Sequence, residues 1–411
     1  MLLFTNLVYF LLINLFDVLY FINESSPSFD ILPKNTFHNN HHAYQNTCNI
    51  IEHHDELYIF YDMDVSEGFN SRRDVYIFFT KLVTKLRKRC QKSIWNLILP
   101  PWYKVPHWRS ENYTCYFTWS NFFDISSLKT YAPVLELEEL FRKTAENFIT
   151  IDTLYVLQRY EYPFENGTYI KKWAINNDEC FYKGNFWGYT NLTAKEVICV
   201  KFPESGSLLW KLLSLRPNDR KIMFSIEFIP PLHHYGSCSY WKCIKSMKFN
   251  KELTKEAERY VEKYFHCNEI ICKSFISIHW RRQDFALSTN APSVTTTAIK
   301  INDVIRKRKT FINNIFIASD GFAQELHQLK MLLNLYNYTV YYYTPNKEEL
   351  RKYKDGGIAI IEQIICSRAL YFFGTLGSHF TLRIHEERNL LRFPYLKSSK
   401  YDLHYEYIED L

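Results

Sequence analysis

The chain has 411 residues, of which 47% are hydrophobic, 18% aromatic and 23% charged. This composition excludes a disordered or fibrous protein, and the length favours two domains over one. The net charge of +6 is mild for such a length, so it suits an anionic small ligand and does not indicate a nucleic-acid surface.

Residues 1–22 are predicted to be a secretory signal peptide. The run from residue 1 to 21 is apolar apart from Thr5, Asn6, Asn14 and Asp17. A signal anchor is the alternative, because no Lys or Arg precedes the run and because it contains an Asp. No later stretch is apolar for long enough to cross a bilayer, so we expect the rest of the chain in a lumen or outside the cell, without stable membrane insertion after cleavage.

Sequons and cysteines indicate the same compartment. Five asparagines have Ser or Thr two positions later, namely Asn23, Asn112, Asn166, Asn191 and Asn337. The ten cysteines suit an oxidising environment, and the pairs close in sequence are Cys180/Cys199, Cys238/Cys243 and Cys267/Cys272. Spacing leaves the connectivity open. No CxxC and no ordered Cys/His spacing occurs, so a zinc site is not expected.

The first half begins with a β-loop-α-β unit. The hydrophobic pattern predicts a buried strand at 57–61, a helix at 72–90 and a strand at 94–99 that Pro100 ends. Between residues 103 and 250 the pattern is mixed and does not order the elements.

In the second half, strands alternate with helices. Strands are predicted at 275–280, 314–319, 340–343 and 370–373, and helices at 303–307, 322–335 and 358–368. Right-handed crossovers then give a mostly parallel, doubly wound sheet. With a boundary near residue 240, we expect Rossmann-like domains at 45–240 and 241–411. Ligands of such sheets bind beyond the carboxyl ends of strands, here the loops after Tyr61, Trp280, Ser319 and Phe373.

The first of these loops runs from Asp62 to Tyr76 and contains Glu67 followed by Gly68. A glycine in a strand-to-helix turn allows close approach of a ligand to the backbone. The carboxylate of Glu67 could accept a proton from an attacking hydroxyl, whereas a solvated turn residue is the alternative interpretation.

The other two loops carry groups that suit phosphate. Arg281 and Arg282 follow a predicted buried strand, and arginine forks match phosphate oxygens; an ordinary salt bridge, such as Arg282 with Asp284, is the alternative. The Gly/Ser/Thr loop from Gly374 to Arg383 opens a helix, whose free amides suit a diphosphate unless they only cap the helix.

Three other motifs are weak indications of metal sites. Asp62-Met63-Asp64 has the DxD form that binds a divalent metal in some enzymes, but three letters recur by chance. The segment from His385 to Asn389 lacks the second His of a zinc protease. The third motif is a cluster of histidines in the Asn-rich entry segment, more often solvated coil than a metal site, at His38, His41, His42, His53 and His54. We therefore expect no metal.

Taken together, the loops resemble the protein O-fucosyltransferase family, in particular its type 2 branch, which modifies thrombospondin type 1 repeats. The matching blocks follow the family's order between about residues 57 and 388. They are Glu67-Gly68-Phe69-Asn70, Arg72 to Tyr76, Leu99 to Trp102 with His107-Trp108, His279 to Arg282 with Asp284-Phe285, Tyr353 to Gly357, and Arg383 to Arg388.

The resemblance implies a GT-B architecture, with two Rossmann-like domains facing across a cleft, and an inverting enzyme of the endoplasmic reticulum lumen. Its donor substrate would be GDP-fucose, with no cofactor, and its acceptor a folded thrombospondin type 1 repeat; no nucleic-acid partner is implied. Glu67 would be the general base, and Arg281 would stabilise the leaving GDP. The implied GDP-fucose site comprises Gly68, Phe69, Asn70, His279, Arg281, Glu362, Ser378, His379 and Phe380, with Glu362 at the guanine edge.

Departures from the family pattern occur at Ser66, Trp280, Glu362 and His379. Two alternatives remain: a non-catalytic chaperone or binder of such repeats in the endoplasmic reticulum, and a fucosyltransferase that acts on glycans. Retention of Glu67 favours an enzyme, because binding alone needs no base.

Overall fold

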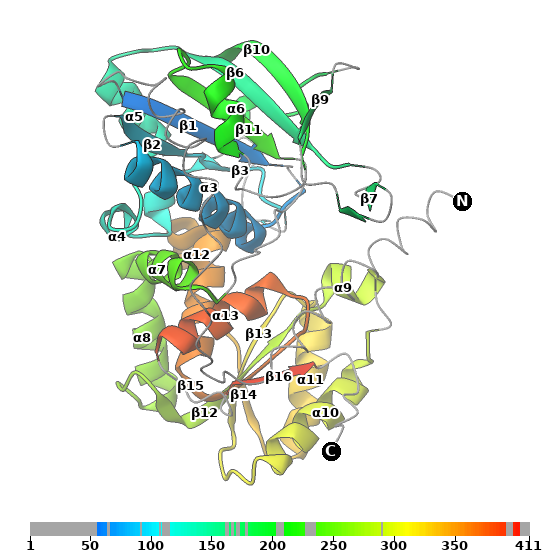
Figure 1. Ribbon diagram of the computed structural model, residues 1–411. Helices are drawn as coiled ribbons and strands as arrows, with labels where there is room; N and C mark the ends of the chain where they lie inside the picture. Colours follow the sequence, from blue (N-terminus) through cyan, green and yellow to red (C-terminus); the bar gives the residue numbers. More distant parts are fainter. Residues whose placement is uncertain are drawn as a thin grey trace, which may run out of the picture. The chain divides into compact units, whose positions relative to one another are not determined.

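The computed structural model describes residues 56–402 except for 64–65, 91–92, 107, 109–115, 161–163, 166–167, 170–172, 177–179, 203–208, 227–235, 289–290 and 392–397. The predicted signal peptide and the His-rich segment lie outside these described residues. Residues 47–411 belong to one compact unit, which contains two parallel-rich sheets (Figure 1).

The first large sheet has seven strands in the order β5-β2-β1-β11-β6-β10-β9. The strands are β1 (Glu56–Met63), β2 (Ile94–Leu99), β5 (Val134–Glu136), β6 (Ile149–Gln158), β9 (Ala174–Asn176), β10 (Leu192–Lys201) and β11 (Lys221–Ile226). All neighbours are parallel except β9, which runs antiparallel to β10. Both strands predicted in this half are confirmed.

Helices and short strands connect and cover this sheet. The helices are α3 (Phe69–Arg89), α4 (Ile125–Lys129), α5 (Leu137–Thr144) and α6 (Leu209–Leu215), with 3-10 turns η1 (Trp119–Asn121) and η2 (Phe186–Gly188). The short strands are β3 (Trp102–Tyr103), β4 (Tyr116–Phe117), β7 (Phe164–Glu165) and β8 (Thr168–Tyr169). Alternate residues of β1 pack in different clusters: Ile59 and Tyr61 with α3, and Tyr58 and Phe60 with α5.

The second large sheet has five parallel strands in the order β14-β13-β12-β15-β16. They are β12 (Cys272–Trp280), β13 (Asn314–Ser319), β14 (Thr339–Tyr341), β15 (Ala369–Gly374) and β16 (Ser398–Asp402). The helices of this half are α7 (Cys238–Ser246), α8 (Lys251–Phe265), α9 (Gln283–Ser288), α10 (Val294–Lys307), α11 (Ala323–Leu335), α12 (Lys347–Arg368) and α13 (His379–Leu390).

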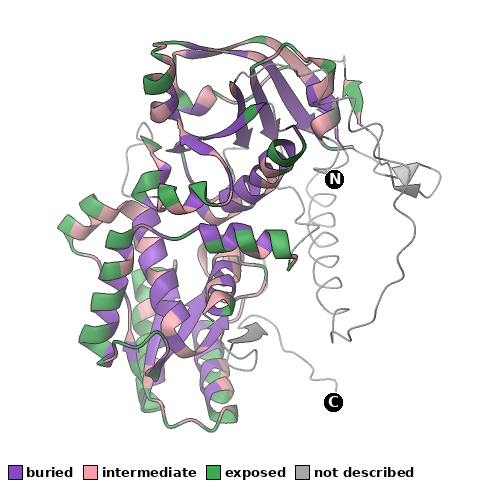
Figure 2. Ribbon diagram, turned by 60° about the vertical axis from the view of Figure 1, so that its left-hand side comes forward, coloured by how far each residue is buried: buried purple, intermediate pink, exposed green. Residues whose placement is uncertain are grey.

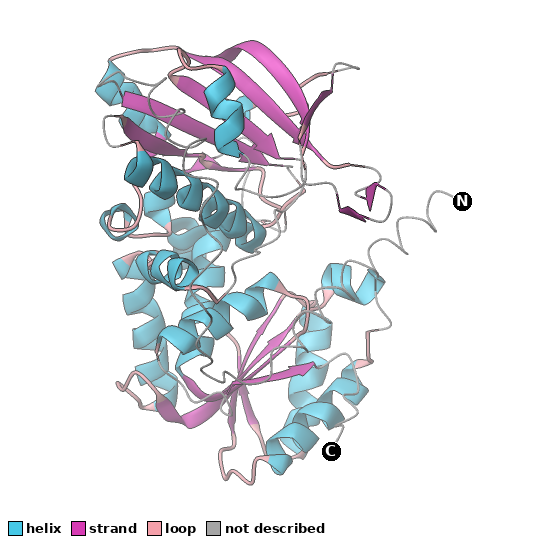
Figure 3. Cartoon of the chain, viewed as in Figure 1, coloured by secondary structure: helices cyan, strands magenta, loops and turns pink. Residues whose placement is uncertain are grey.

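Strand β12 shows why this sheet is covered on both faces. Ile276 and Ile278 share a core with α10 and α11, whereas Phe275 shares a core with α8 and α12. Because side chains alternate along a strand, His279 points to the α12 side of the sheet. Buried residues fill the strands (Figure 2), and helices flank them (Figure 3). The predicted doubly wound arrangement is present; the domain boundary near residue 240 stays a prediction.

Two helices are longer than their sequence patterns indicate. Helix α10 begins at Val294 and not at 303, because Ser293 caps it through a side-chain bond to Thr296 N. Helix α12 begins at Lys347 and not at 358. Its early part has two glycines and a kink at Lys354, where φ is +59°, and these features obscure the helical pattern.

Two of the three proposed cysteine pairs are confirmed as disulfides, Cys180–Cys199 and Cys267–Cys272. The pairing of Cys238 with Cys243 is wrong, since both thiols are free. Both residues lie in α7, where a spacing of five places side chains about 7.5 Å apart along the axis and about 140° apart around it.

Within the described ranges, no helix combines the length and the apolar character needed to cross a bilayer.

Candidate active site

The loop before α3 holds Glu67 through its backbone. Arg72, which is buried, donates from Nε to the Glu67 carbonyl at 2.9 Å and from Nη1 to the Tyr103 carbonyl at 2.9 Å. Gly68 is the N-cap of α3 with an extended conformation. Arg72 thus connects the main chain of Glu67 to β3. Glu67 itself is partly exposed. Arg72 therefore supports the loop that carries Glu67. In the sequence, Arg72 was named only as part of a block that matches the family, and this contact was not predicted.

Phe69 anchors the start of α3 in an aromatic cluster. Its ring centroid lies 4.7 Å from that of Trp102 and 5.5 Å from that of Phe122. Gly356 of α12 contacts the same cluster, because a Cβ there would lie 2.6 Å from Trp108 and 2.8 Å from Phe122. Phe69, one of the residues proposed for the donor site, is 6% exposed and packs in this cluster. Gly356 allows α12 to approach the cluster closely, because it has no side chain.

Asp62, at the end of β1, is committed to hydrogen bonds within the protein. Its Oδ1 accepts from Met63 N at 2.8 Å and from Trp187 Nε1 at 3.1 Å, and its Oδ2 accepts from the Tyr182 hydroxyl. Burial raises its pKa. The first residue of the DxD pattern thus has a structural role; the second, Asp64, lies outside the described residues.

At the carboxyl end of β12, the Arg281 guanidinium lies between two carboxylates. Nη2 is 2.8 Å from Asp284 and Nη1 is 2.7 Å from Asp320. Arg282 instead pairs with Glu325 of α11, so the suggested Arg282–Asp284 pair is wrong. Asp320 follows β13 directly, and its place after a parallel strand was the signal that could have found it.

His279 and the loop from Gly374 to Thr381 form one hydrogen-bonded unit. The His279 ring lies 2.7 Å from Thr381 Oγ1 and stacks on Phe380 with centroids 4.5 Å apart. Thr375 Oγ1 donates to the His279 carbonyl at 3.0 Å and accepts from Arg281 N at 3.1 Å. These bonds hold the loop from Gly374 to Thr381 next to Arg281, and both were predicted from the sequence to bind phosphate.

The loop then opens α13. Ser378 is its N-cap and makes no side-chain capping bond. Gly377 has φ +74° with open space around it, a conformation that suits glycine. The free amides and positive end of α13 can bind an anion.

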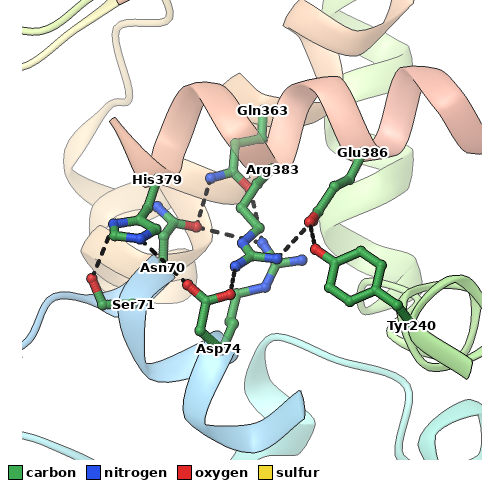
Figure 4. A network of polar contacts seen from close by, with 9 residues as sticks. Asn70, Ser71, Asp74, Tyr240, Gln363, His379, Arg383 and Glu386 are labelled. Atoms are coloured by element: carbon green, nitrogen blue, oxygen red, sulfur yellow. Dashed lines mark hydrogen bonds and ion pairs between the residues drawn. The ribbon is translucent and has the colours of Figure 1, made fainter. Parts of the chain in front are cut away.

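A buried network connects α3 with α7, α12 and α13 (Figure 4). Arg383 pairs with both Asp74 and Glu386, and Glu386 also accepts from the Tyr240 hydroxyl. These four side chains are almost fully enclosed. The network was not expected from the sequence, although the block from Arg383 to Arg388 was recognised.

His379 connects the phosphate loop with α3. Its Nδ1 is 3.4 Å from Ser71 Oγ, and its Nε2 is 3.5 Å from Asp74 Oδ2. Asn70, one position before Ser71, accepts a bond from Gln363 Nε2 at 2.9 Å. The structure thus joins the start of α3 to both the phosphate loop and α12.

Glu362, next to Gln363 in α12, is partly exposed and has no hydrogen bond or ion pair with any residue that the structure describes. Burial, and secondarily the charge of Asp320, raise its pKa to about 8. This carboxyl is available for donors from a ligand. No group of three His, Cys, Asp or Glu side chains arranged for a metal ion occurs within the described ranges.

Comparisons with known proteins agree on the family. The O-FucT family, described as GDP-fucose protein O-fucosyltransferase, matches residues 58–391. GDP-fucose protein O-fucosyltransferase 2 of Homo sapiens is 31% identical over 369 residues, covering 81% of this chain and 83% of that protein. Its Caenorhabditis elegans counterpart is 30% identical over 376 residues, covering 83% and 85%.

Solved structures show the same fold. Apo POFUT1 superposes with a TM-score of 0.55 at 15% identity, covering 84% of this chain and 97% of that one. POFUT1 in complex with GDP-fucose gives 0.54 at 14% identity, covering 81% and 95%. The fold is GT-B, as expected. The chain is a glycosyltransferase and belongs to the GDP-fucose protein O-fucosyltransferase family.

Proposed function

We propose that this enzyme transfers fucose from GDP-fucose to a Ser or Thr hydroxyl of a folded thrombospondin type 1 repeat. The observation that carries the proposal is the contact of α3 with α13 through His379. It brings the helix that follows Glu67 to the helix end that suits a diphosphate. The relatives named type 2 enzymes and the POFUT1 complex with GDP-fucose support this donor.

In this proposal the reaction inverts the anomeric carbon. The acceptor oxygen forms a bond to that carbon, Glu67 takes the hydroxyl proton, and the bond from the carbon to the β-phosphate oxygen breaks. GDP leaves with the electron pair, and Arg281 stabilises the charge on the β-phosphate. Because Arg281 is held by Asp284 and Asp320 in the free enzyme, a phosphate oxygen would replace one of these carboxylates.

The donor would lie against the groups already joined around α13. Ser378, His379 and Phe380, with the loop amides, would bind the phosphates and the nucleoside. His279 would support this loop through Thr381. Gly68 and Asn70 would contact the sugar nucleotide at the start of α3, and Glu362 would accept hydrogen bonds from the guanine edge.

We further propose a metal-independent reaction in the lumen of the endoplasmic reticulum. Hydrogen bonds from Met63, Tyr182 and Trp187 already occupy both carboxylate oxygens of Asp62, which supports a DxD pattern without metal. The disulfides Cys180–Cys199 and Cys267–Cys272 support an oxidising compartment.

The test is GDP release from GDP-fucose by the purified enzyme, with and without a folded repeat, and with a chelator present. We expect release that requires the folded repeat and survives the chelator. Glu67→Ala should abolish transfer and leave GDP binding nearly unchanged, because the base acts on the acceptor. Glu262→Ala, a change at an exposed glutamate of α8, is the matched control.

Unchanged turnover of Glu67→Ala would exclude Glu67 as the base. Donor binding without transfer to any repeat would instead indicate a binding protein, and transfer to a free glycan would indicate a glycan-modifying enzyme.

A further inference from the structure

The side-chain amide of Asn70 has a defined orientation (Figure 4). Its Oδ1 accepts from Gln363 Nε2 at 2.9 Å and from Arg73 Nη1 at 3.4 Å. The same Arg73 nitrogen donates to Gln363 Oε1 at 3.3 Å. A guanidinium can only donate hydrogen bonds, so the atoms that face Arg73 must be the two amide oxygens. The assignment of oxygen and nitrogen in both amides follows from this contact.

Arg73 is itself held in place. It is 3% exposed, and its guanidinium carbon lies 5.4 Å from the ring centroids of both Phe123 and Phe249. Burial, and secondarily the charge of Arg383, lower its pKa to about 10. Arg73 therefore remains a cation at neutral pH and cannot become a hydrogen-bond acceptor.

The nitrogen of the Asn70 amide is left for another partner. Asn70 is partly exposed, and no residue that the structure describes hydrogen-bonds to its Nδ2. Gln363, in contrast, is 2% exposed and contacts Asn70 from the protein side. The oxygen of Asn70 is thus bonded inside the protein, and its two N–H groups remain.

We propose that Arg73 and Gln363 make Asn70 a hydrogen-bond donor toward the ligand, so that Asn70 selects an acceptor oxygen of the bound sugar nucleotide. Gln363 is then a positioning residue that acts through Asn70. The inference rests on the proposed function, in which the donor contacts Asn70. The acceptor oxygen belongs either to the diphosphate or to the sugar, and a ligand that presents an N–H group at this point is rejected.

The decisive variant is Gln363→Glu. A carboxylate at 363 can only accept, so it would oppose the Asn70 oxygen across the 2.9 Å contact. We expect the Asn70 amide to turn its nitrogen toward this carboxylate and its oxygen toward the ligand, and to give up the longer 3.4 Å bond from Arg73. We expect the affinity for GDP-fucose to fall by roughly 10-fold or more, because a hydrogen bond is replaced by two opposed acceptors. Thermal stability should not fall in parallel, because the buried Arg73 gains a counter-charge. A purely structural role of Gln363 would move affinity only together with stability.

Two further variants and a control complete the test. Asn70→Asp keeps an acceptor for Gln363 but directs a charged oxygen at the ligand, so it should lose at least as much affinity. Gln363→Met removes one donor while Arg73 still holds the Asn70 oxygen, so its loss should be smaller. Gln328→Glu makes the same charge change at an exposed site on α11 and should bind like the unaltered protein.

The affinities are measured by calorimetry for GDP and for GDP-fucose separately. A loss for both ligands assigns the oxygen to the diphosphate, and a loss for GDP-fucose alone assigns it to the sugar. Unchanged affinity of Gln363→Glu for both ligands, in a folded protein, would overturn the inference. Failure of the proposed function has a different signature, since absence of fucose transfer leaves these binding measurements intact.

Discussion

Arg281 and Arg383 each pair with two carboxylates, but in opposite surroundings. The Arg281 side chain is 17% exposed, and its partner Asp284 is 52% exposed. The Arg383 side chain is fully enclosed, as are those of Asp74 and Glu386, at 2% and 1%. A buried charge must keep its partners, whereas a charge at the surface can exchange them for a ligand. The same residue type therefore stabilises the fold at one place and is proposed to bind phosphate at the other.

Arg383→Met tests whether the buried arginine stabilises the fold, and it has the largest expected effect. Removal of the guanidinium leaves Asp74 and Glu386 buried without the cation that pairs with both of them, so we expect a loss of about 3–5 kcal/mol in the free energy of unfolding. Urea denaturation measures this loss. Arg351→Met, at an exposed position of α12, is the control. A loss below about 1 kcal/mol for Arg383→Met would show that the network does not stabilise the fold.

Arg281→Ala should give the reverse result. We expect a change in unfolding free energy below about 1 kcal/mol, a fall in kcat/KM for GDP-fucose of about 10²–10³-fold, and weaker GDP binding. Arg281→Lys should recover only part of the activity, because an ammonium lacks the two-pronged fit to phosphate. Steady-state kinetics and calorimetry measure these effects. If Arg281→Ala binds GDP normally, Arg281 is a structural residue like Arg383.

The carboxyl of Glu362 should make the affinity for GDP depend on pH. With its pKa raised to about 8 from 4.5, Glu362 is mostly protonated at pH 7, whereas the proposed contact with two guanine N–H donors requires the ionised form. GDP affinity should therefore rise roughly tenfold between pH 7 and pH 8.5. Glu362→Gln should remove this rise, and calorimetry at the two pH values measures it. An identical rise in the variant would assign the effect to another group.

The sign for stability is opposite to that for binding. The folded state holds the Glu362 proton more tightly than the unfolded state does. The protonated carboxyl therefore contributes to the free energy of unfolding fully below pH 4.5, and this contribution is lost as pH rises through about 8. Between these values Glu362→Gln should reduce the decline in stability of the ligand-free protein.

The smallest expected effect concerns the exposed partner of Arg281. Asp284→Asn removes one competitor for the guanidinium, so GDP should bind about 2–5-fold more tightly, as an exposed ion pair contributes less than about 1 kcal/mol. Calorimetry is again the measurement, and Asp303→Asn, at an exposed position of α10, is the control. Weaker GDP binding by Asp284→Asn would show that Asp284 orients Arg281 for the phosphate.

The sequence predicted the strands and the loops that follow them, because buried strands and breaking residues are local signals. Strands β2 and β13 have the predicted bounds. Helices α10 and α12 were predicted too short, since β-branched residues and glycines weaken the local helical pattern. The elements between β2 and β11 could not be ordered, because strand order in a sheet depends on pairing over long sequence distances.

The candidate site divides in the same way. Glu67, Arg281 and the loop at Ser378 were proposed because they follow strands or open a helix, and their roles stay predictions. Gln363 and Asp74 were missed as contact residues, since their partners lie about 300 positions away in the chain. Asp320 could have been found from its place after β13, but a single Asp after a strand has too many other uses to stand out.

Helix α3 fixes the spacing between three residues of the candidate site. Asn70, Arg73 and Asp74 are three and four positions apart, so they lie on one side of the helix, and this side meets α12 and α13. One inserted residue would rotate everything beyond it by about 100° and separate the Asn70 amide from the buried ion pair of Asp74. Homologous enzymes should therefore vary in length in the loop before Gly68, whereas the first turns of α3 should admit no insertion or deletion.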